Sequence, residues 1–206
     1  MFAPICFLNV IVFLAWRVPM LNQTMMKYFC TTPSSRVLCW PMLLSAFSHY
    51  SFLHLAANMC VLHSFSHMAV QTLGKEQFVA FYLTSGVISS FTSYLYKTMV
   101  GVCSPSLGAS GAIMGIIGLI CTQYPETYLS IIFLPMYHFK AGTVIKGIIG
   151  FDLMGCILQW KIFDHAAHLG GVLFGIFWQM WGNANLWQQR KPVLSFWHQL
   201  RGSSKS

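Results

Sequence analysis

Charged side chains are scarce in this sequence. Only 8% of its 206 residues are Asp, Glu, Lys or Arg, whereas a soluble domain has roughly 25%. Hydrophobic residues make up 56% of the chain and the mean hydropathy is +0.61. Because so little charge cannot cover the surface of a soluble globule, the composition predicts a polytopic membrane protein that contacts the lipid bilayer.

The net charge of +8 comes from 12 basic and only 4 acidic residues. In a membrane protein we assign such an excess to loops and to anchoring at lipid headgroups. No basic stripe alternates with aromatic residues, so we expect no nucleic-acid partner. The sequence does not indicate an oligomeric state.

Several common patterns are absent. The seven cysteines show no CxxC spacing, so we interpret them as small buried residues rather than a disulfide framework. His165/His168 and His63/His67 have helical spacings that suit zinc, but no HExxH motif accompanies them, so we expect no metal and no cofactor. The two halves show no internal symmetry, which argues against a transporter or channel.

Apolar runs predict six membrane-spanning segments, at about residues 2–19, 50–71, 77–99, 108–124, 141–160 and 165–182. Backbone groups in lipid need internal partners, so these segments must be helices. The apolar piece 128–137 is too short to span and contains Pro135, so we expect an interfacial or re-entrant segment. The predicted fold class is therefore an all-α membrane bundle of six helices.

A Gly-Ala-Ser-Gly sequence that contains Ser110 opens the fourth predicted span. Gly108 permits a backbone turn that other residues disfavour. Gly111, Gly115 and Gly118 follow at helical spacings and form a face that another helix can approach closely. Ser110 is thus either a nucleophile on a tight turn or part of a packing motif, with its hydroxyl bonded to a carbonyl.

The sixth predicted span has its own glycine face, which carries His168 together with Gly171 and Gly175. Packing of the two glycine faces would bring Ser110 toward His168, and a neutral imidazole can accept a serine proton. The alternative is a core histidine with a satisfied hydrogen bond. Ionisable residues inside membrane spans are functional candidates by default.

His54 and Asn58 are four residues apart in the second predicted span, on one helix face. Both side chains can donate hydrogen bonds to a developing oxyanion, which is often a large catalytic contribution. The alternative is that they only hydrogen-bond between helices. We assign His49, near the membrane edge, to a loop hydrogen bond.

Two acidic residues, Asp164 and Asp152, lie in or next to the predicted spans near these candidate residues. Asp164 precedes His168 by four residues, and it suits the N-cap of the sixth span better than a third catalytic position. Asp152 lies inside the fifth span without an obvious partner, and we interpret it as a structural hydrogen-bonding group.

Three motifs together resemble the rhomboid family of intramembrane serine proteases. His54-x-x-x-Asn58 is similar to the HxxxN of the second core helix, and the Gly-Ala-Ser-Gly around Ser110 is similar to the GxSG that opens the fourth. The Ala-His-Leu-Gly-Gly around His168 is similar to the AHxxG of the sixth. Further stretches resemble a mitochondrial branch of the family, among them Arg36–Cys39, Pro41–Ser45, Phe47–His49, Phe133–Met136 and Phe163–Gly171.

The resemblance implies that Ser110 is the nucleophile and His168 the general base of a dyad that requires no acid. The Ser110 N–H, His54 and Asn58 would form the oxyanion hole. The substrates would be single-pass transmembrane proteins, cut in or near the mitochondrial inner membrane.

Residues 37–183 would be the protease core. Residues 1–36 would hold the first span and the start of a long loop, with a shortened amino terminus relative to that branch. Residues 184–206 would form a basic interfacial or disordered tail. A second possibility stays open, a catalytically silent relative that binds transmembrane helices for trafficking or quality control. Such relatives typically lack the serine or the histidine.

Overall fold

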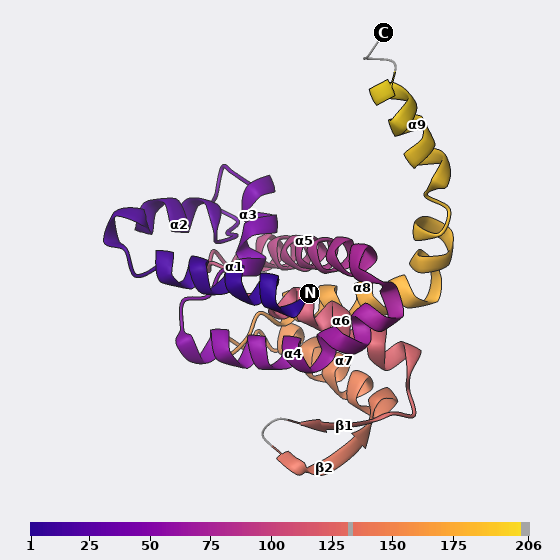
Figure 1. Cartoon of the computed structure of the whole chain (residues 1–206). Coiled ribbons are helices and arrows are strands. Elements are labelled where there is room, and N and C mark those ends of the chain that lie inside the picture. Colours follow the sequence, from indigo (N-terminus) through magenta and orange to yellow (C-terminus); the bar gives the residue numbers. More distant parts are fainter. Residues whose placement is uncertain (132–133, 203–206) are drawn as a thin grey trace.

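Helices form most of the chain, as its apolar composition predicts. The computed structural model describes residues 1–131 and 134–202, and Figure 1 labels most of its elements. In chain order these are α1 (Phe2–Ala15), η1 (Pro19–Leu21), α2 (Asn22–Tyr28), α3 (Cys39–Leu44), η2 (Ser45–Phe47), α4 (Phe52–Leu73), α5 (Lys75–Val100), α6 (Ser110–Gln123), β1 (Tyr128–Ile131), β2 (Leu134–Lys140), α7 (Ala141–Ile157), α8 (His165–Phe177), η3 (Trp178–Trp187) and α9 (Lys191–Gly202).

Within the segment expected to be interfacial or re-entrant, 128–137, residues 128–131 and 134–137 belong to strands β1 and β2, so the all-α prediction is wrong there. The other two residues of that segment, 132 and 133, lie outside the described residues. β1 and β2 pair antiparallel, with Tyr128 opposite Lys140. Tyr128 is exposed, whereas the next residue, Leu129, packs against the core. This alternation suits a strand with one solvated face, and hairpin pairing satisfies the backbone locally.

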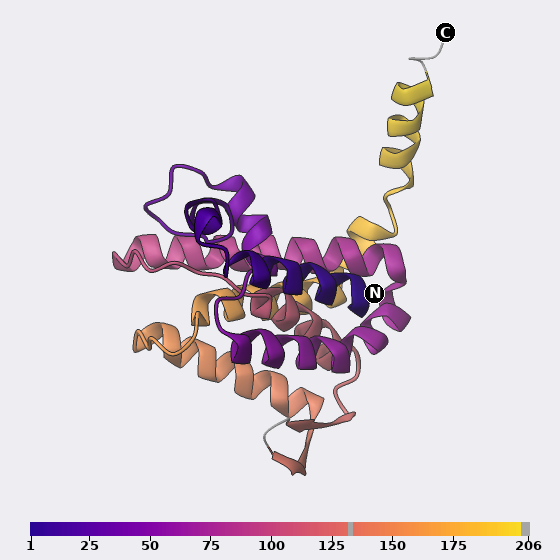
Figure 2. The ribbon, with the colours of Figure 1, turned by 60° about the vertical axis from the view of Figure 1, so that its left-hand side comes forward.

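The chain bends sharply at the end of the first predicted span, 2–19. α1 ends at Ala15, and the segment Pro19–Tyr28 lies at 99° to it. Proline fixes its own φ and has no N–H to donate, so a new helical segment begins at Pro19. At the other end of the chain η3 continues α8, and α9 stands away from the bundle in Figures 1 and 2.

Among the described residues, α5 is the one helix that is long and apolar enough by itself to cross a membrane, and α1 passes the same test only when joined to Pro19–Tyr28. α6 has 14 residues, which extend about 21 Å against a hydrocarbon core of about 30 Å. The arrangement of six spans therefore stays a prediction.

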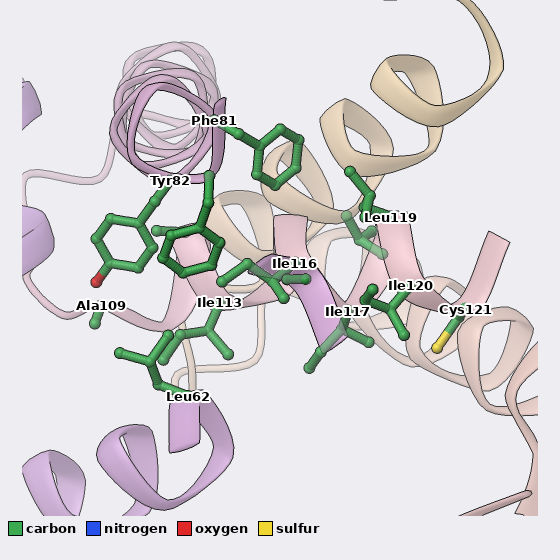
Figure 3. Close-up of a cluster of buried hydrophobic side chains, with 14 of the residues drawn as sticks. Leu62, Phe81, Tyr82, Ala109, Ile113, Ile116, Ile117, Leu119, Ile120 and Cys121 are labelled. Atoms are coloured by element: carbon green, nitrogen blue, oxygen red, sulfur yellow. The ribbon is translucent and has the colours of Figure 1, made fainter. Parts of the chain in front are cut away.

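α6 lies at the centre of the bundle, between α4, α5, α7 and α8 (Figures 1 and 2). Its side chains Ile113 and Ile116 meet Leu62 of α4 and Phe81 and Tyr82 of α5 in the buried cluster of Figure 3. A helix that is apolar on all sides must be covered on all sides. α6 therefore lies in the protein interior, and Ser110 is its first residue.

Glycines of α8 let it touch the backbone of α6. A Cβ added at Gly171 would collide with the carbonyl oxygen of Gly111, and one at Gly175 would collide with that of Gly115. Neither obstacle is a movable side chain, so α8 can lie this close only with glycine at these positions.

The glycines of α6 face α5 as well as α8, which was the neighbour expected from the sequence. Side chains at Gly111 and Gly115 would first strike Ser89 and Ser85 of α5. Of these three glycines, Gly118 is the one whose added Cβ would first meet α8, at the backbone of Val172. The glycine face of α6 is thus shared between two neighbouring helices, and α5 contributes to the packing that the sequence had assigned to α8.

Candidate active site

Ser110 and His168 meet where α6 and α8 begin. The Nε2 atom of His168 lies 3.0 Å from the Oγ atom of Ser110, although the two residues are 58 positions apart in the chain. His168 is 8% exposed and Ser110 is partly buried. At this separation a neutral imidazole can accept the hydroxyl proton.

The turn before Ser110 depends on Gly108. Its φ is +138°, a backbone conformation that favours glycine, and an added Cβ would lie 2.8 Å from Cε1 of His54. The Gly108 N–H donates to the carbonyl oxygen of Ser45 at 2.9 Å. Gly108 therefore makes the turn possible and also leaves room for the His54 ring beside Ser110.

His49 holds the next residue of the turn, which confirms the expected loop hydrogen bond. The Ala109 N–H donates to Nε2 of His49 at 3.3 Å. Burial and the neighbouring His54 lower the pKa of His49 to about 3, so its neutral ring can accept this bond. The side chain of Trp16, the residue that follows α1, donates to Ser48 at 2.8 Å and also fixes this loop.

His54 and Asn58 lie one turn apart on α4 and line one cavity together with Ser110 and His168. Nδ2 of Asn58 donates to the carbonyl oxygen of His54 at 2.8 Å. An amide nitrogen has two protons, so a second one is available to a ligand. The structure thus brings four of the predicted site residues together at the starts of α4, α6 and α8.

The cavity has a volume of about 580 Å³, in the range of small-molecule sites. Away from the polar residues its walls are apolar and come mainly from α4, α6 and α7. These walls include Val61, Ile117, Val144, Ile148 and Phe151. The site therefore suits an apolar ligand that presents a polar group to Ser110.

Asp152 of α7 also lines this cavity, although the sequence identified no partner for it. Its Oδ1 lies 2.7 Å from Nδ1 of His165 and 3.5 Å from Nδ1 of His168. Asp152 is 1% exposed. An acid inside a span needs a partner, and the short 158–164 connection makes α7 and α8 neighbours. The sequence therefore pointed to α8 as the neighbouring helix but did not identify the partner residue.

Asp164 is the N-cap of α8, as expected, since its Oδ1 accepts from the Ala167 N–H at 3.1 Å. Its Oδ2 forms an ion pair with Lys97 of α5 at 2.9 Å. Burial would raise the pKa of Asp164, but the Lys97 ammonium and the hydroxyls of Ser106 and Ser93 outweigh it and lower that pKa. The sequence did not predict Lys97.

The histidines considered for zinc have other neighbours. The His63 ring packs edge-on against Phe2 of α1, with centroids 5.0 Å apart, and His165 pairs with Asp152. Within 1–131 and 134–202, no group of three or more His, Cys, Asp or Glu residues is placed to hold a metal ion.

Comparison with known proteins gives a consistent picture. A model of the Rhomboid domain matches residues 37–183. The mitochondrial presenilin-associated rhomboid-like protein of Bos taurus is 56% identical over 95% of this chain and 52% of its own length. The mitochondrial Rhomboid protein 1 of Saccharomyces cerevisiae is 31% identical over 91% of this chain and 54% of its own length. The Rhomboid protease GluP of Bacillus subtilis is 30% identical over 67% of this chain and 25% of its own length.

The chain spans about half the length of the mitochondrial relatives it matches. The similarity to the mitochondrial branch that the sequence predicted is confirmed. The chain is a mitochondrial integral membrane protein, as the matched rhomboid domain and the mitochondrial relatives together indicate. By its matched domain and its relatives, the chain belongs to the rhomboid family.

Proposed function

We propose that this chain is an intramembrane serine endopeptidase in which Ser110 is the nucleophile and His168 the general base. The observation that supports this most is the 3.0 Å approach of His168 Nε2 to Ser110 Oγ inside a cavity. Ser110 would attack the scissile carbonyl carbon while its proton moves to His168. The imidazolium would then protonate the leaving amine, and water would hydrolyse the acyl-enzyme.

The proposed oxyanion hole consists of the Ser110 backbone N–H and the side chains of Asn58 and His54. Ser110 is the first residue of α6, and the first N–H groups of a helix have no intrahelical acceptor. They also lie at the positive end of the helix dipole. Donors held in place before the reaction stabilise the negative oxygen of the tetrahedral intermediate.

We also propose that Asp152 orients the base. A carboxylate 3.5 Å from Nδ1 of His168 favours the tautomer that carries its proton on Nδ1. Nε2 is then free to accept the proton of Ser110, and the carboxylate stabilises the imidazolium that results. His165 holds the carboxylate at 2.7 Å from the other side.

Rhomboid family proteins act on transmembrane substrates, and we propose single-pass transmembrane proteins of the mitochondrial inner membrane as substrates here. The apolar walls of the cavity support this substrate class. An amide inside an intact helix is hydrogen-bonded and shielded, so the substrate would have to unwind near its cut site. We further propose that residues 37–183 form the protease core and that α1 and α4–α8 are the six spans.

The test is cleavage of a single-pass transmembrane reporter by the purified protein in liposomes. We expect Ser110→Ala to abolish cleavage while the protein still accumulates in membranes. Ser64→Ala is the matched control, since the Ser64 hydroxyl is exposed on α4 and bonds only within its own helix. Full activity in Ser110→Ala would refute the proposed dyad. Reporter binding without cleavage by the unaltered protein would favour a silent helix-binding protein.

A further inference from the structure

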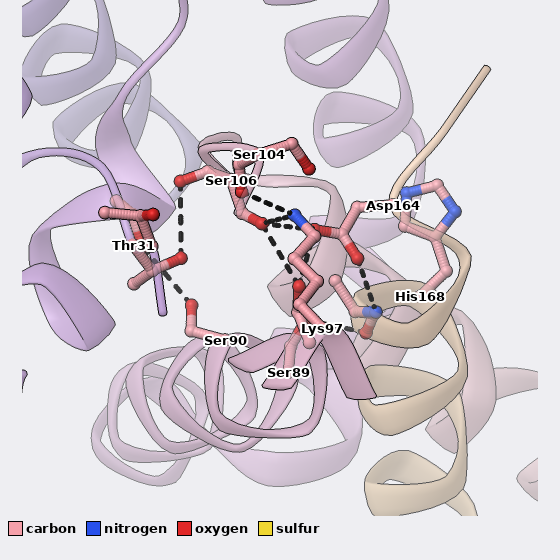
Figure 4. A network of polar contacts seen from close by, with 12 residues as sticks. Thr31, Ser89, Ser90, Lys97, Ser104, Ser106, Asp164 and His168 are labelled. Carbon is pink, nitrogen blue, oxygen red and sulfur yellow. Dashed lines mark hydrogen bonds and ion pairs between the residues drawn. The ribbon is translucent and has the colours of Figure 1, made fainter. Parts of the chain in front are cut away.

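A polar cluster behind the dyad joins the two chain segments that lead to Ser110 and His168. Ser106 precedes Ser110 by four residues, and Asp164 precedes His168 by the same number. The Ser106 hydroxyl donates to Oδ2 of Asp164 (Figure 4). A direct hydrogen bond thus joins the residue four positions before Ser110 to the residue four positions before His168.

Lys97 of α5 joins both segments at once. Its Nζ donates to Oδ2 of Asp164 at 2.9 Å, to the carbonyl oxygen of Ser104 at 3.3 Å, and to the Ser106 hydroxyl. Ser93, one turn earlier on α5, donates to the same carboxylate oxygen at 2.6 Å. α5, the segment before α6 and the start of α8 therefore meet at one ion pair, drawn at the centre of Figure 4.

Helix capping alone does not account for this cluster. Asp164 caps α8 through Oδ1, and that bond needs no lysine. Lys97 is 8% exposed, and burying an ammonium group is costly unless it is paired and hydrogen-bonded. Here both charges are compensated, because three side chains donate to Oδ2 of Asp164 and Lys97 has three acceptors. Such a satisfied network fixes the relative position of its members.

The Ser106 segment is also fixed on its opposite side. Its N–H donates to the carbonyl oxygen of Thr31 at 2.8 Å, and the Thr31 N–H donates to that of Ser106 at 2.9 Å. Ser106 is therefore held between the loop after α2 and the Lys97–Asp164 pair. Movement of this segment relative to α8 would break several hydrogen bonds together.

We propose that Lys97, Ser106 and Asp164 are positioning residues that set the distance between Ser110 and His168. The proposal rests on the proposed function, since it concerns the geometry of that dyad. A misplacement of about 1 Å can cost about 10²-fold in rate. Loss of this cluster should therefore lower the rate of the chemical step and leave substrate binding largely unchanged, because the cluster does not line the cavity.

The experiment compares Lys97→Met with Lys97→Arg in full-length protein reconstituted in liposomes. We measure kcat and KM for a single-pass reporter and the thermal unfolding midpoint. We expect Lys97→Met to lower kcat roughly 10- to 100-fold with KM within about twofold. Lys97→Arg keeps the charge and its donors, so we expect most of kcat to return. Ser106→Ala, which leaves the ion pair intact, should give a smaller fall in kcat.

The control is Lys140→Met, which removes the exposed ion pair with Glu126 beside the β-hairpin and should leave kcat unchanged. If Lys97→Met and Ser106→Ala turn over like the unaltered protein, the positioning role is wrong. An equal fall of kcat in Lys97→Met and Lys97→Arg would also contradict it. If the unaltered protein neither cleaves the reporter nor reacts with a fluorophosphonate, the proposed function itself fails.

Discussion

At the scale of single residues, the proposed chemistry depends on a few buried or partly buried polar groups in an apolar protein. Ser110, His168, His54 and Asn58 were predictable because polar side chains in apolar spans are costly and therefore noticeable. Asp152 and Lys97 were equally visible as charges, but their partners were not. Whether a carboxylate on α7 faces His168 depends on how two helices rotate against each other, which one sequence does not determine.

Asp152→Asn tests the proposed orienting role of this acid. Asparagine has nearly the same shape, so packing should persist, but it lacks the charge that faces Nδ1 of His168. We expect kcat to fall roughly 10- to 100-fold with KM nearly unchanged, less than the 10²–10⁴-fold that a general base typically contributes. Steady-state cleavage of the liposome reporter measures both constants. Unaltered kcat would mean that Asp152 serves only to hold His165.

At the scale of elements, the helices were easier to predict than their contacts. The ranges predicted for the later spans agree with α4–α8 to within a few residues at most ends, because runs of apolar residues and the glycines and prolines that end them are local signals. The hairpin was missed because its strands contain few residues and expose aromatic side chains such as Tyr128. An end of the first span near Pro19 was expected, but the 99° bend into Pro19–Tyr28 was not. A proline signals where a helix ends and does not set the direction of the helical segment that follows.

The glycine contacts between α6 and α8 suggest a second test at this scale. Gly171→Val would drive a side chain into the backbone of Gly111, and backbone cannot yield as a side chain can. Overpacking typically costs about 1–3 kcal/mol, and here it would also separate His168 from Ser110. We expect a lower unfolding midpoint and at least a 10-fold loss of cleavage.

Gly150→Val is the matched control, because a Cβ at Gly150 of α7 meets no atom within 4 Å. This variant should unfold and cleave like the unaltered protein. Normal cleavage by Gly171→Val would show that the helices can separate without harm to the site. That result would remove the α6–α8 contact from our account of how the dyad is held.

At the scale of the whole molecule, one central helix connects packing with the proposed chemistry. α6 is apolar on all sides and is covered by its neighbours (Figure 3). Its first residue, Ser110, lies beside the starts of α4 and α8. The polar residues of the site gather at this end of the bundle. The same packing gives the cavity its apolar walls, which suit the transmembrane substrates proposed above.

The central claim is that His168 activates Ser110. Its most direct test is covalent labelling of the reconstituted protein by a serine-directed fluorophosphonate, with the modified residue identified by mass spectrometry. We predict that Ser110 is labelled in the unaltered protein, and that His168→Ala reduces the labelling rate by about 10²-fold or more. Labelling of Ser110 at the same rate in His168→Ala, or no labelling of Ser110 in the unaltered protein, would contradict the account.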